Sequence, residues 1–289
     1  MRQLLRTALL AAWPLPSPAQ DNTPFAAFDL ASEAVLNDPH DLAFGPDGRL
    51  YVADKFGSRI AVFDPETLKL EGVIAEGKLP NVHDIDFGPD GRAAVAVTAL
   101  GAVLVFDDIT ATPIRTPQFF PAPRTEGALL HSNGRLYAMA GGTGQIIAFA
   151  GSTVYAEAGR HFGAHDIAED NEGNIWIADN AARRLVKYSQ ELELLQVLSH
   201  PKFGFVGPRY MDIDEFGRLV VADQDAHRIL LIDPDGPDGG TLLGVLGTGV
   251  AGKGPNEFDD PEGVAVEGNR YFFADSDNNR VVRYTIVLN

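Results

Sequence analysis

The sequence predicts an all-β protein folded as a single six-bladed β-propeller. Three observations support this prediction. A segment of about forty residues recurs six times along the chain. Each copy is typical of short strands separated by tight turns, and no amphipathic helical stretch of useful length interrupts the pattern. Repeated antiparallel units of this length are typical of blades arranged around a central axis.

The six copies share one order of strands and turns. In each copy a short apolar strand leads to a turn, and a second strand follows, for example Leu50 to Ala53. In four copies this second strand ends at an aspartate, with an arginine five residues later, as in Asp54 and Arg59. We expect this regular pair to be structural rather than catalytic. The copies occupy residues 39–54, 82–91, 125–140, 164–179, 208–223 and 261–275.

The last copy needs a partner from the other end of the chain. It supplies three strands before Asn289, whereas a propeller blade has four. Residues 25–36, FAAFDLASEAVL, precede the first copy and contain a further candidate strand. Pairing would cover an edge that is otherwise exposed. We therefore predict that this N-terminal strand closes the ring.

Residues 1–19 are typical of an export signal. Arg2 and Arg6 make the start basic, the following apolar stretch is too short to span a bilayer, and small residues surround a cleavage site after Ala19. We expect a secreted or periplasmic protein with one propeller domain over residues 20–289. No later segment is apolar and long enough to predict a membrane span.

Composition narrows the possible partners. The net charge of −17 repels phosphate backbones, which argues against a nucleic-acid partner. The sequence has no cysteine, so disulfides and thiolate metal ligands are excluded. Any metal must be bound by histidine, carboxylate, backbone oxygen or water.

One position of the repeat is polar and ionisable in every copy. In the first five copies it lies eight residues before the turn glycine. Because equivalent positions of a propeller repeat meet around its axis, we expect these side chains to face the central channel. The six ring residues are, in order, His40, His83, Glu126, His165, Arg209 and Glu262.

The ring predicts a metal centre. Three neutral imidazoles directed at one axis suit Zn²⁺ or another divalent cation, with a position left open for water or substrate. His40, His83 and His165 are therefore the candidate ligands. Glu126 or Glu262 would complete the coordination or act as a base. The alternative is that these polar side chains only hydrate a water-filled channel.

The same position predicts how a substrate would be bound. Arg209 would bind a substrate carboxylate, and Tyr210 beside it would donate or accept a proton. Each ring histidine is followed by an aspartate, namely Asp41, Asp84 and Asp166. Strict alternation along a strand would turn these aspartates away from the channel. We expect them either to accept a hydrogen bond from a neighbouring imidazole or backbone group, or to cap a turn.

Two stretches of the sequence resemble the NHL repeat, and the ring resembles a family of lyases. Residues 247–266, GTGVAGKGPNEFDDPEGVAV, and 274–281, ADSDNNRV, resemble the NHL repeat, and the resemblance extends over nearly the whole mature chain. The ring further resembles the peptidyl-α-hydroxyglycine α-amidating lyase (peptidylamidoglycolate lyase) family. Its members are six-bladed propellers in which three axial histidines bind zinc, several in P-H-x-[LI] strand starts. His40 in PHDLAF and His165 in AHDIAE match that motif, and His83 in VHDIDF matches it less fully.

This resemblance implies a metal-dependent carbon–nitrogen lyase acting on a small polar substrate with a carbonyl or carboxylate group, of peptide origin. Arg209 and Tyr210 are the nearest counterparts of the arginine and tyrosine that the family has beside its metal. A structural Ca²⁺ is a further expected ion. Two other interpretations stay open. One is a lactonase resembling gluconolactonase and regucalcin, to which Glu126-Gly127 and Glu262-Gly263 are faintly similar. The other is a non-catalytic NHL scaffold that binds a protein partner.

Overall fold

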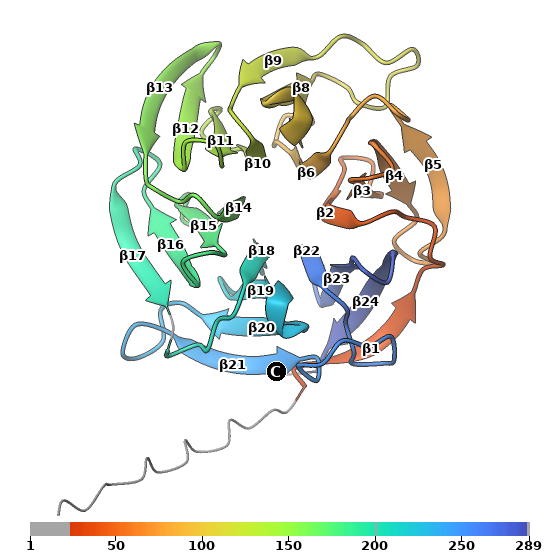
Figure 1. Ribbon diagram of the computed structural model, residues 1–289, viewed down its shortest axis with the longest axis vertical. Helices are drawn as coiled ribbons and strands as arrows, with labels where there is room; N and C mark the ends of the chain where they lie inside the picture. Colours follow the sequence, from red (N-terminus) through yellow and green to blue (C-terminus); the bar gives the residue numbers. More distant parts are fainter. Residues whose placement is uncertain (1–23, 200, 288–289) are drawn as a thin grey trace, which may run out of the picture.

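Six four-stranded antiparallel sheets surround a central channel in the computed structural model of the protein (Figure 1). The structure describes residues 24–199 and 201–287, so the predicted export signal lies outside the described residues. The prediction of a six-bladed β-propeller is confirmed. Among the described residues, no helix has the length and apolar character needed to cross a membrane.

Each blade begins with its innermost strand and ends at the outer rim. The strands of the first three blades are β2 (Pro39–Phe44), β3 (Leu50–Asp54), β4 (Arg59–Phe63), β5 (Leu70–Ile74), β6 (Val82–Phe87), β7 (Ala93–Val97), β8 (Ala102–Phe106), β9 (Gln118–Pro121), β10 (Thr125–Leu130), β11 (Leu136–Ala140), β12 (Gln145–Ala150) and β13 (Thr153–Ala158). The strands of the fourth and fifth blades are β14 (Ala164–Glu169), β15 (Ile175–Asp179), β16 (Arg184–Tyr188), β17 (Leu194–Ser199), β18 (Pro208–Ile213), β19 (Leu219–Asp223), β20 (Arg228–Asp233) and β21 (Thr241–Leu246). The sixth blade contains β22 (Pro261–Glu267), β23 (Arg270–Asp275), β24 (Arg280–Ile286) and β1 (Ala26–Ala31). Two single-turn 3₁₀ helices are η1 (Thr98–Leu100) and η2 (Gln224–Ala226).

The N-terminal strand closes the ring, as predicted. β1 pairs antiparallel with β24, with Ala26 opposite Ile286. Phe25, immediately before β1, is fully buried, and its ring centroid lies 5.9 Å from that of Tyr271. A Cβ atom at Gly244 would lie 2.8 Å from the Phe25 Cβ, so the absence of a side chain there makes room for this anchor. The last blade is therefore completed by the first strand of the chain.

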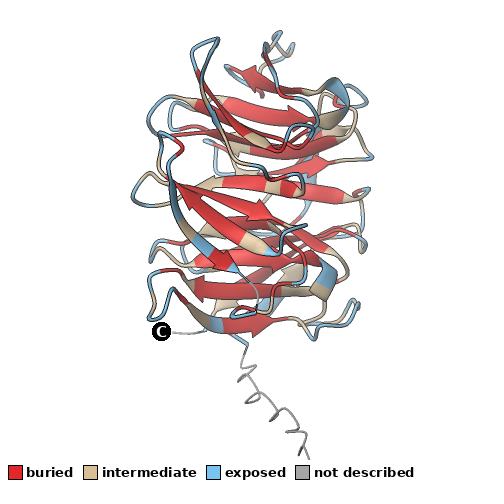
Figure 2. Cartoon of the chain, turned by 60° about the vertical axis from the view of Figure 1, so that its left-hand side comes forward, coloured by how far each residue is buried: buried red, intermediate tan, exposed pale blue. Residues whose placement is uncertain are grey.

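The apolar core lies between adjacent blades rather than in one central layer. Side chains such as Tyr51 of the first blade and Val95 of the second pack in a shared cluster. The second and third strands of most blades are buried along their length, because both faces of a blade pack against its neighbours (Figure 2). The channel-facing strands are thereby fixed by apolar packing on both sides.

The repeated aspartate–arginine pairs stabilise the loops that lead to the ring. In the first blade Arg59 Nε lies 2.7 Å from Asp54 Oδ2. Asp54 also accepts the Asn37 N–H at 2.6 Å, and the Arg59 guanidinium donates to the Val35 carbonyl at 3.0 Å. Equivalent pairs join Asp179 to Arg184, Asp223 to Arg228 and Asp275 to Arg280. The pair in the first blade tethers the loop that ends at His40, which agrees with its expected structural role.

A break in strand pairing recurs at the ring position of every blade. Between the first and second strands the register shifts at, or directly around, each ring residue, which leaves it without a partner in the ladder. A β-bulge of this kind bends the strand and redirects a side chain. The bulge is therefore the local feature that directs the ring side chains to the axis.

Candidate functional site

Half of the ring forms a contact group around Glu262. His40 Nδ1 lies 3.0 Å from Glu262 Oε2, and Arg209 Nε lies 3.3 Å from the same oxygen. The Arg209 guanidinium also comes within 3.5 Å of His40 Nε2. Three side chains from the first, fifth and sixth blades are thus brought together by the fold.

The other half of the ring forms around Glu126. His83 Nε2 lies 3.0 Å from Glu126 Oε2, and His165 Nε2 lies 4.0 Å from the same oxygen. The two halves meet where the His40 and His83 rings pack edge to face, with centroids 4.6 Å apart. All six predicted ring residues therefore line one channel.

Backbone carbonyls fix the orientation of two ring histidines. His83 Nδ1 lies 3.0 Å from the Asn81 carbonyl, and His165 Nδ1 lies 3.1 Å from the Gly163 carbonyl. In both cases the acceptor is two residues upstream, and Nε2 faces Glu126. A histidine that donates one ring N–H to a carbonyl presents its other nitrogen as a metal ligand.

The hydrogen bonds of Thr98 indicate which ring nitrogen of His83 carries the proton. The Thr98 hydroxyl donates to the Thr125 carbonyl at 2.6 Å, so it acts as an acceptor toward His83 Nδ1, 2.7 Å away. His83 Nδ1 therefore carries the proton, and its Nε2 lone pair points toward Glu126.

Burial favours the neutral form of both the ring histidines and the ring glutamic acids. Burial lowers the pKa of His83 to about 3 and holds the pKa values of His40 and His165 well below the ordinary range. Neutral imidazole is the form that binds a metal. Burial also raises the pKa of Glu126 to about 7 and that of Glu262 well above its usual range.

The ring contains a concentration of unsatisfied polar atoms. Among the described residues, six buried side-chain polar atoms lack a hydrogen-bond partner, and four of them belong to the ring. Each of the four ring atoms lies 3.0–3.3 Å from another ring atom without hydrogen-bond geometry. Four in one channel indicate a site arranged for a ligand. The four atoms are His40 Nδ1, Glu126 Oε2, Arg209 Nε and Glu262 Oε2.

Within residues 24–199 and 201–287, one group of three side chains brings its ligand atoms within 4.8 Å of one another. That group is Asp38, His40 and Glu262. Its imidazole and carboxylate donors fit Zn²⁺ and other divalent cations. The predicted ligand set of His40, His83 and His165 lines the same channel without forming so compact a group, and it stays a prediction.

Residues outside the predicted ring support it. Gln224 accepts a hydrogen bond from Arg209 at 2.6 Å and donates to Glu262 Oε1 at 2.8 Å. Lys55 Nζ lies 2.8 Å from Asp38. Sequence reasoning missed these residues. Their signal is positional, because Lys55, Thr98 and Gln224 each directly follow the last residue of the second strand of their blade.

Tyr210, next to the ring residue Arg209, joins two opposite blades by a hydrogen bond. Its fully buried hydroxyl donates to the His83 carbonyl at 3.0 Å, between the fifth and second blades, which lie opposite each other (Figure 1). The hydroxyl proton is thus used in a bond across the channel. The proton-transfer role predicted for Tyr210 stays a prediction.

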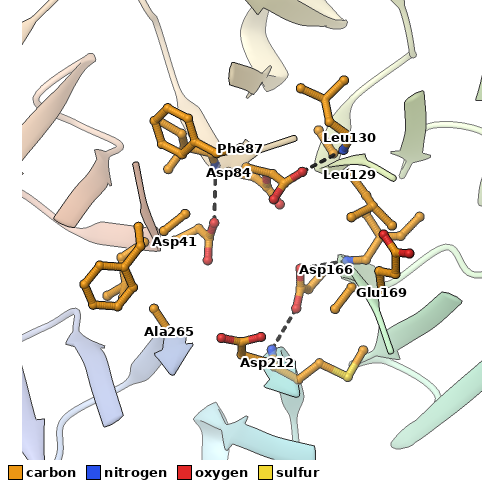
Figure 3. Close-up of a pocket in the computed structure, with 18 of the residues that line it drawn as sticks. Asp41, Asp84, Phe87, Leu129, Leu130, Asp166, Glu169, Asp212 and Ala265 are labelled. Atoms are coloured by element: carbon orange, nitrogen blue, oxygen red, sulfur yellow. Dashed lines mark hydrogen bonds between the residues drawn. The ribbon is translucent and has the colours of Figure 1, made fainter. Parts of the chain in front are cut away.

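Beyond Tyr210 the channel widens into an acidic cavity of about 450 Å³ (Figure 3). The expectation that Asp41, Asp84 and Asp166 turn away from the channel is wrong, because all three line this cavity. The bulge beside each ring residue interrupts the strict alternation on which that expectation depended. The acidic pocket is lined by Asp41, Asp84, Asp86, Asp166, Glu169 and Asp212, together with apolar side chains.

The pocket aspartates also join neighbouring blades. Asp41 accepts the Ile85 N–H at 3.2 Å, and Asp166 accepts the Met211 N–H at 2.7 Å. The expected hydrogen bond from a backbone group is therefore present, and it comes from the innermost strand of the next blade.

Asp86→Asn is expected to stabilise the protein at pH 8 but not at pH 4. Burial raises the pKa of Asp86 to about 7, so the folded state takes up a proton more readily than the unfolded chain. The contribution of Asp86 to the unfolding free energy should therefore fall as pH rises from about 4 to about 7. The asparagine removes the cost of a buried ionised carboxylate. It also retains an oxygen for the Leu130 N–H, which in the parent protein donates to Asp86 Oδ2 at 2.6 Å.

Urea denaturation at the two pH values, without divalent cations or amines, measures the difference. We expect the variant to gain about 1–3 kcal/mol at pH 8. Equal stability of the two proteins at pH 8 would contradict this account of Asp86.

Comparisons with known proteins agree with this architecture. The model of the NHL repeat family matches residues 36–63, in the first blade. No curated protein sequence matches the chain. With the fold and the repeat together, the protein is a six-bladed β-propeller containing an NHL repeat.

Several solved structures share the fold. Virginiamycin B lyase from Staphylococcus aureus is 12% identical, with a TM-score of 0.62 over 87% of this chain and 96% of that chain. The PQQ-bound aldose sugar dehydrogenase from Streptomyces coelicolor is 15% identical, with a TM-score of 0.64 over 93% of this chain and 100% of that chain. An auxiliary nutrient binding protein from Bacteroides ovatus is 16% identical, with a TM-score of 0.67 over 95% of this chain and 76% of that chain. These identities show a common fold and leave the activity to the residues of the channel.

Proposed function

We propose that the protein is a metal-dependent lyase whose channel ring binds a divalent cation, with Zn²⁺ the first candidate. Its substrate would be a small polar molecule with a carbonyl or carboxylate group. The supporting observation is the ring itself, in which six ionisable side chains converge and four buried polar atoms make close charged contacts but no hydrogen bond. A ring that only hydrated the channel would not need oriented, neutral imidazoles.

His83 would bind the cation through Nε2 together with Glu126 Oε2, and the side chains of His165 and His40 would move toward it to complete the predicted set. A bound divalent cation polarises a carbonyl or lowers the pKa of a hydroxyl group. Glu126 suits the role of general base, because its carboxylate lies at the cation site and faces the two histidines.

Arg209 would orient the substrate. Gln224 fixes one end of its guanidinium, and its Nε lies 3.3 Å from Glu262 Oε2 without a hydrogen bond. A guanidinium placed in this way pairs with a carboxylate. A peptidyl-α-hydroxyglycine offers both a carboxylate and a carbinolamide hydroxyl. The base takes the hydroxyl proton, the carbonyl forms as the C–N bond breaks, and the amide nitrogen takes up a proton as glyoxylate leaves.

A structural relative supports lyase chemistry on this fold. One solved structure is a catalytically inactive histidine-to-alanine variant of virginiamycin B lyase from Staphylococcus aureus with quinupristin, at 11% identity to this chain and a TM-score of 0.65. We further propose that the enzyme acts in the periplasm or outside the cell, because residues 1–19 are typical of an export signal.

A lactonase is the second candidate function. The observation that favours it is the compact Asp38, His40 and Glu262 group, whose two carboxylates make a more oxygen-rich donor set than three histidines. Oxygen ligands suit Ca²⁺, and lactone opening needs only a polarised carbonyl and an activated water.

Metal analysis and two substrates distinguish the candidates. The purified full chain should contain about one divalent cation per molecule, release glyoxylate from a peptidyl-α-hydroxyglycine, and lose that activity to a chelator until Zn²⁺ is restored. His131→Ala provides a control, because His131 is buried outside the ring. Opening of a sugar lactone without glyoxylate release would favour the second candidate. Absence of metal and of both activities would leave only a scaffold.

A further inference from the structure

The acidic pocket brings carboxyl groups together without a cationic side chain beside them. Six carboxylates line it, and none of its other lining residues is lysine, arginine or histidine. Asp84 is 2% exposed, and its Oδ1 has no hydrogen-bond partner. An unpaired carboxylate oxygen buried in this way is costly, and a bound cation would satisfy it.

The spacing of the carboxylates disfavours a bare metal ion. No three of them bring oxygens within 4.8 Å of one another among the described residues, whereas Ca²⁺ needs six to eight oxygens at about 2.3–2.6 Å. A volume of about 450 Å³ lies in the range of pockets that bind small organic molecules. The pocket therefore fits an organic cation better than an ion held directly by these side chains.

The carboxylates lie on opposite walls of the pocket. Asp41 on β2 is across the channel from Asp166 on β14 (Figure 3), and β6, which contains Asp86, is across the channel from β18, which contains Asp212 (Figure 1). The third and sixth blades, which lie between these pairs, contribute the apolar residues Ala128, Leu129, Leu130, Ala265 and Val266. A ligand with two cationic ends and an apolar stem matches this lining.

The rim of the pocket is open to solvent. Pro89 and Ser132 at its rim are exposed, Asp86 is partly buried and Asp84 is fully buried. At the inner end Tyr210 crosses the channel. The pocket is therefore accessible from solvent, and none of the six ring residues lines it.

We propose that the acidic pocket binds a linear alkyl diamine or polyamine. Its ammonium groups pair with aspartates on opposite blades, and its methylene stem packs against the apolar walls of the third and sixth blades. This proposal does not depend on the function of the ring.

Calorimetric titration of the full chain with spermidine at pH 8, above the pKa of about 7 of Asp86 and of about 6 of Asp212, tests it. The double variant Asp86→Asn/Asp212→Asn should bind spermidine about 100-fold more weakly, since each lost charged contact costs about tenfold. The surface variant Asp90→Asn/Asp108→Asn removes the same charge at exposed positions and should bind like the parent protein. Thermal unfolding of each variant verifies that it is folded.

Three results would overturn the proposal. The first is that spermidine produces no saturable heat with the parent protein. The second is an equal loss in the surface variant, which would indicate nonspecific attraction to the acidic protein. The third is saturable Ca²⁺ binding, lost in the pocket variant, with no spermidine binding. His83→Ala should retain spermidine binding, so failure of the ring proposal and failure of this one can be distinguished.

Discussion

His83→Ala is expected to weaken divalent-cation binding by at least about 100-fold and to abolish glyoxylate release while the fold is retained. His83 Nε2 faces Glu126 Oε2 at 3.0 Å, and its proton is fixed on Nδ1 by Asn81 and Thr98. Losing a partner of a ligand alone costs about 10–100-fold in metal affinity, so losing the ligand itself should cost more. Competition with a chelator of known affinity, followed by metal analysis, measures the change.

Thr98→Val is the matched variant for this experiment. It retains His83 but removes the hydroxyl that helps to hold its Nδ1–H. We expect an intermediate effect of about tenfold on cation affinity. Unchanged metal content and activity in His83→Ala would rule out His83 as a ligand.

Phe25→Ala is expected to lower the free energy of unfolding by about 3–5 kcal/mol. Phe25 is fully buried against Tyr271 and directly precedes β1, the strand that closes the ring. Loss of this ring leaves a cavity between the fifth and sixth blades, where Gly244 makes room for it. A weakened anchor also exposes the outer edge of β24.

Urea denaturation of Phe25→Ala and Phe28→Ala provides the measurement. Phe28 lies in β1 itself but is 37% exposed, so its replacement should cost about 1 kcal/mol or less. Equal losses in the two variants would show that the buried anchor has no special part in closure.

The fold and the membership of the ring could be predicted because the repeat encodes both. Equivalent positions of six copies must meet around one axis, so internal alignment alone brought together His40, His83, Glu126, His165, Arg209 and Glu262. The same reasoning paired the N-terminal segment with the last blade, because three strands leave an open edge.

Local backbone geometry limited the rest. The bulge at each ring position has no clear signature in the sequence, so strict alternation predicted the wrong direction for Asp41. Distances between imidazoles depend on how far each side chain extends into the channel, which a repeat pattern does not specify. Asp38 and Gln224 were missed because they reach the ring from loops and turns rather than from the innermost strands.

Anomalous diffraction on either side of the zinc absorption edge, from crystals grown with Zn²⁺, tests most directly the proposal that the ring binds a metal. We predict one strong peak in the central channel, about 2.0–2.2 Å from His83 Nε2 and from a ring carboxylate oxygen. A channel without a peak, or zinc bound only at a peripheral histidine such as His227, would contradict the account.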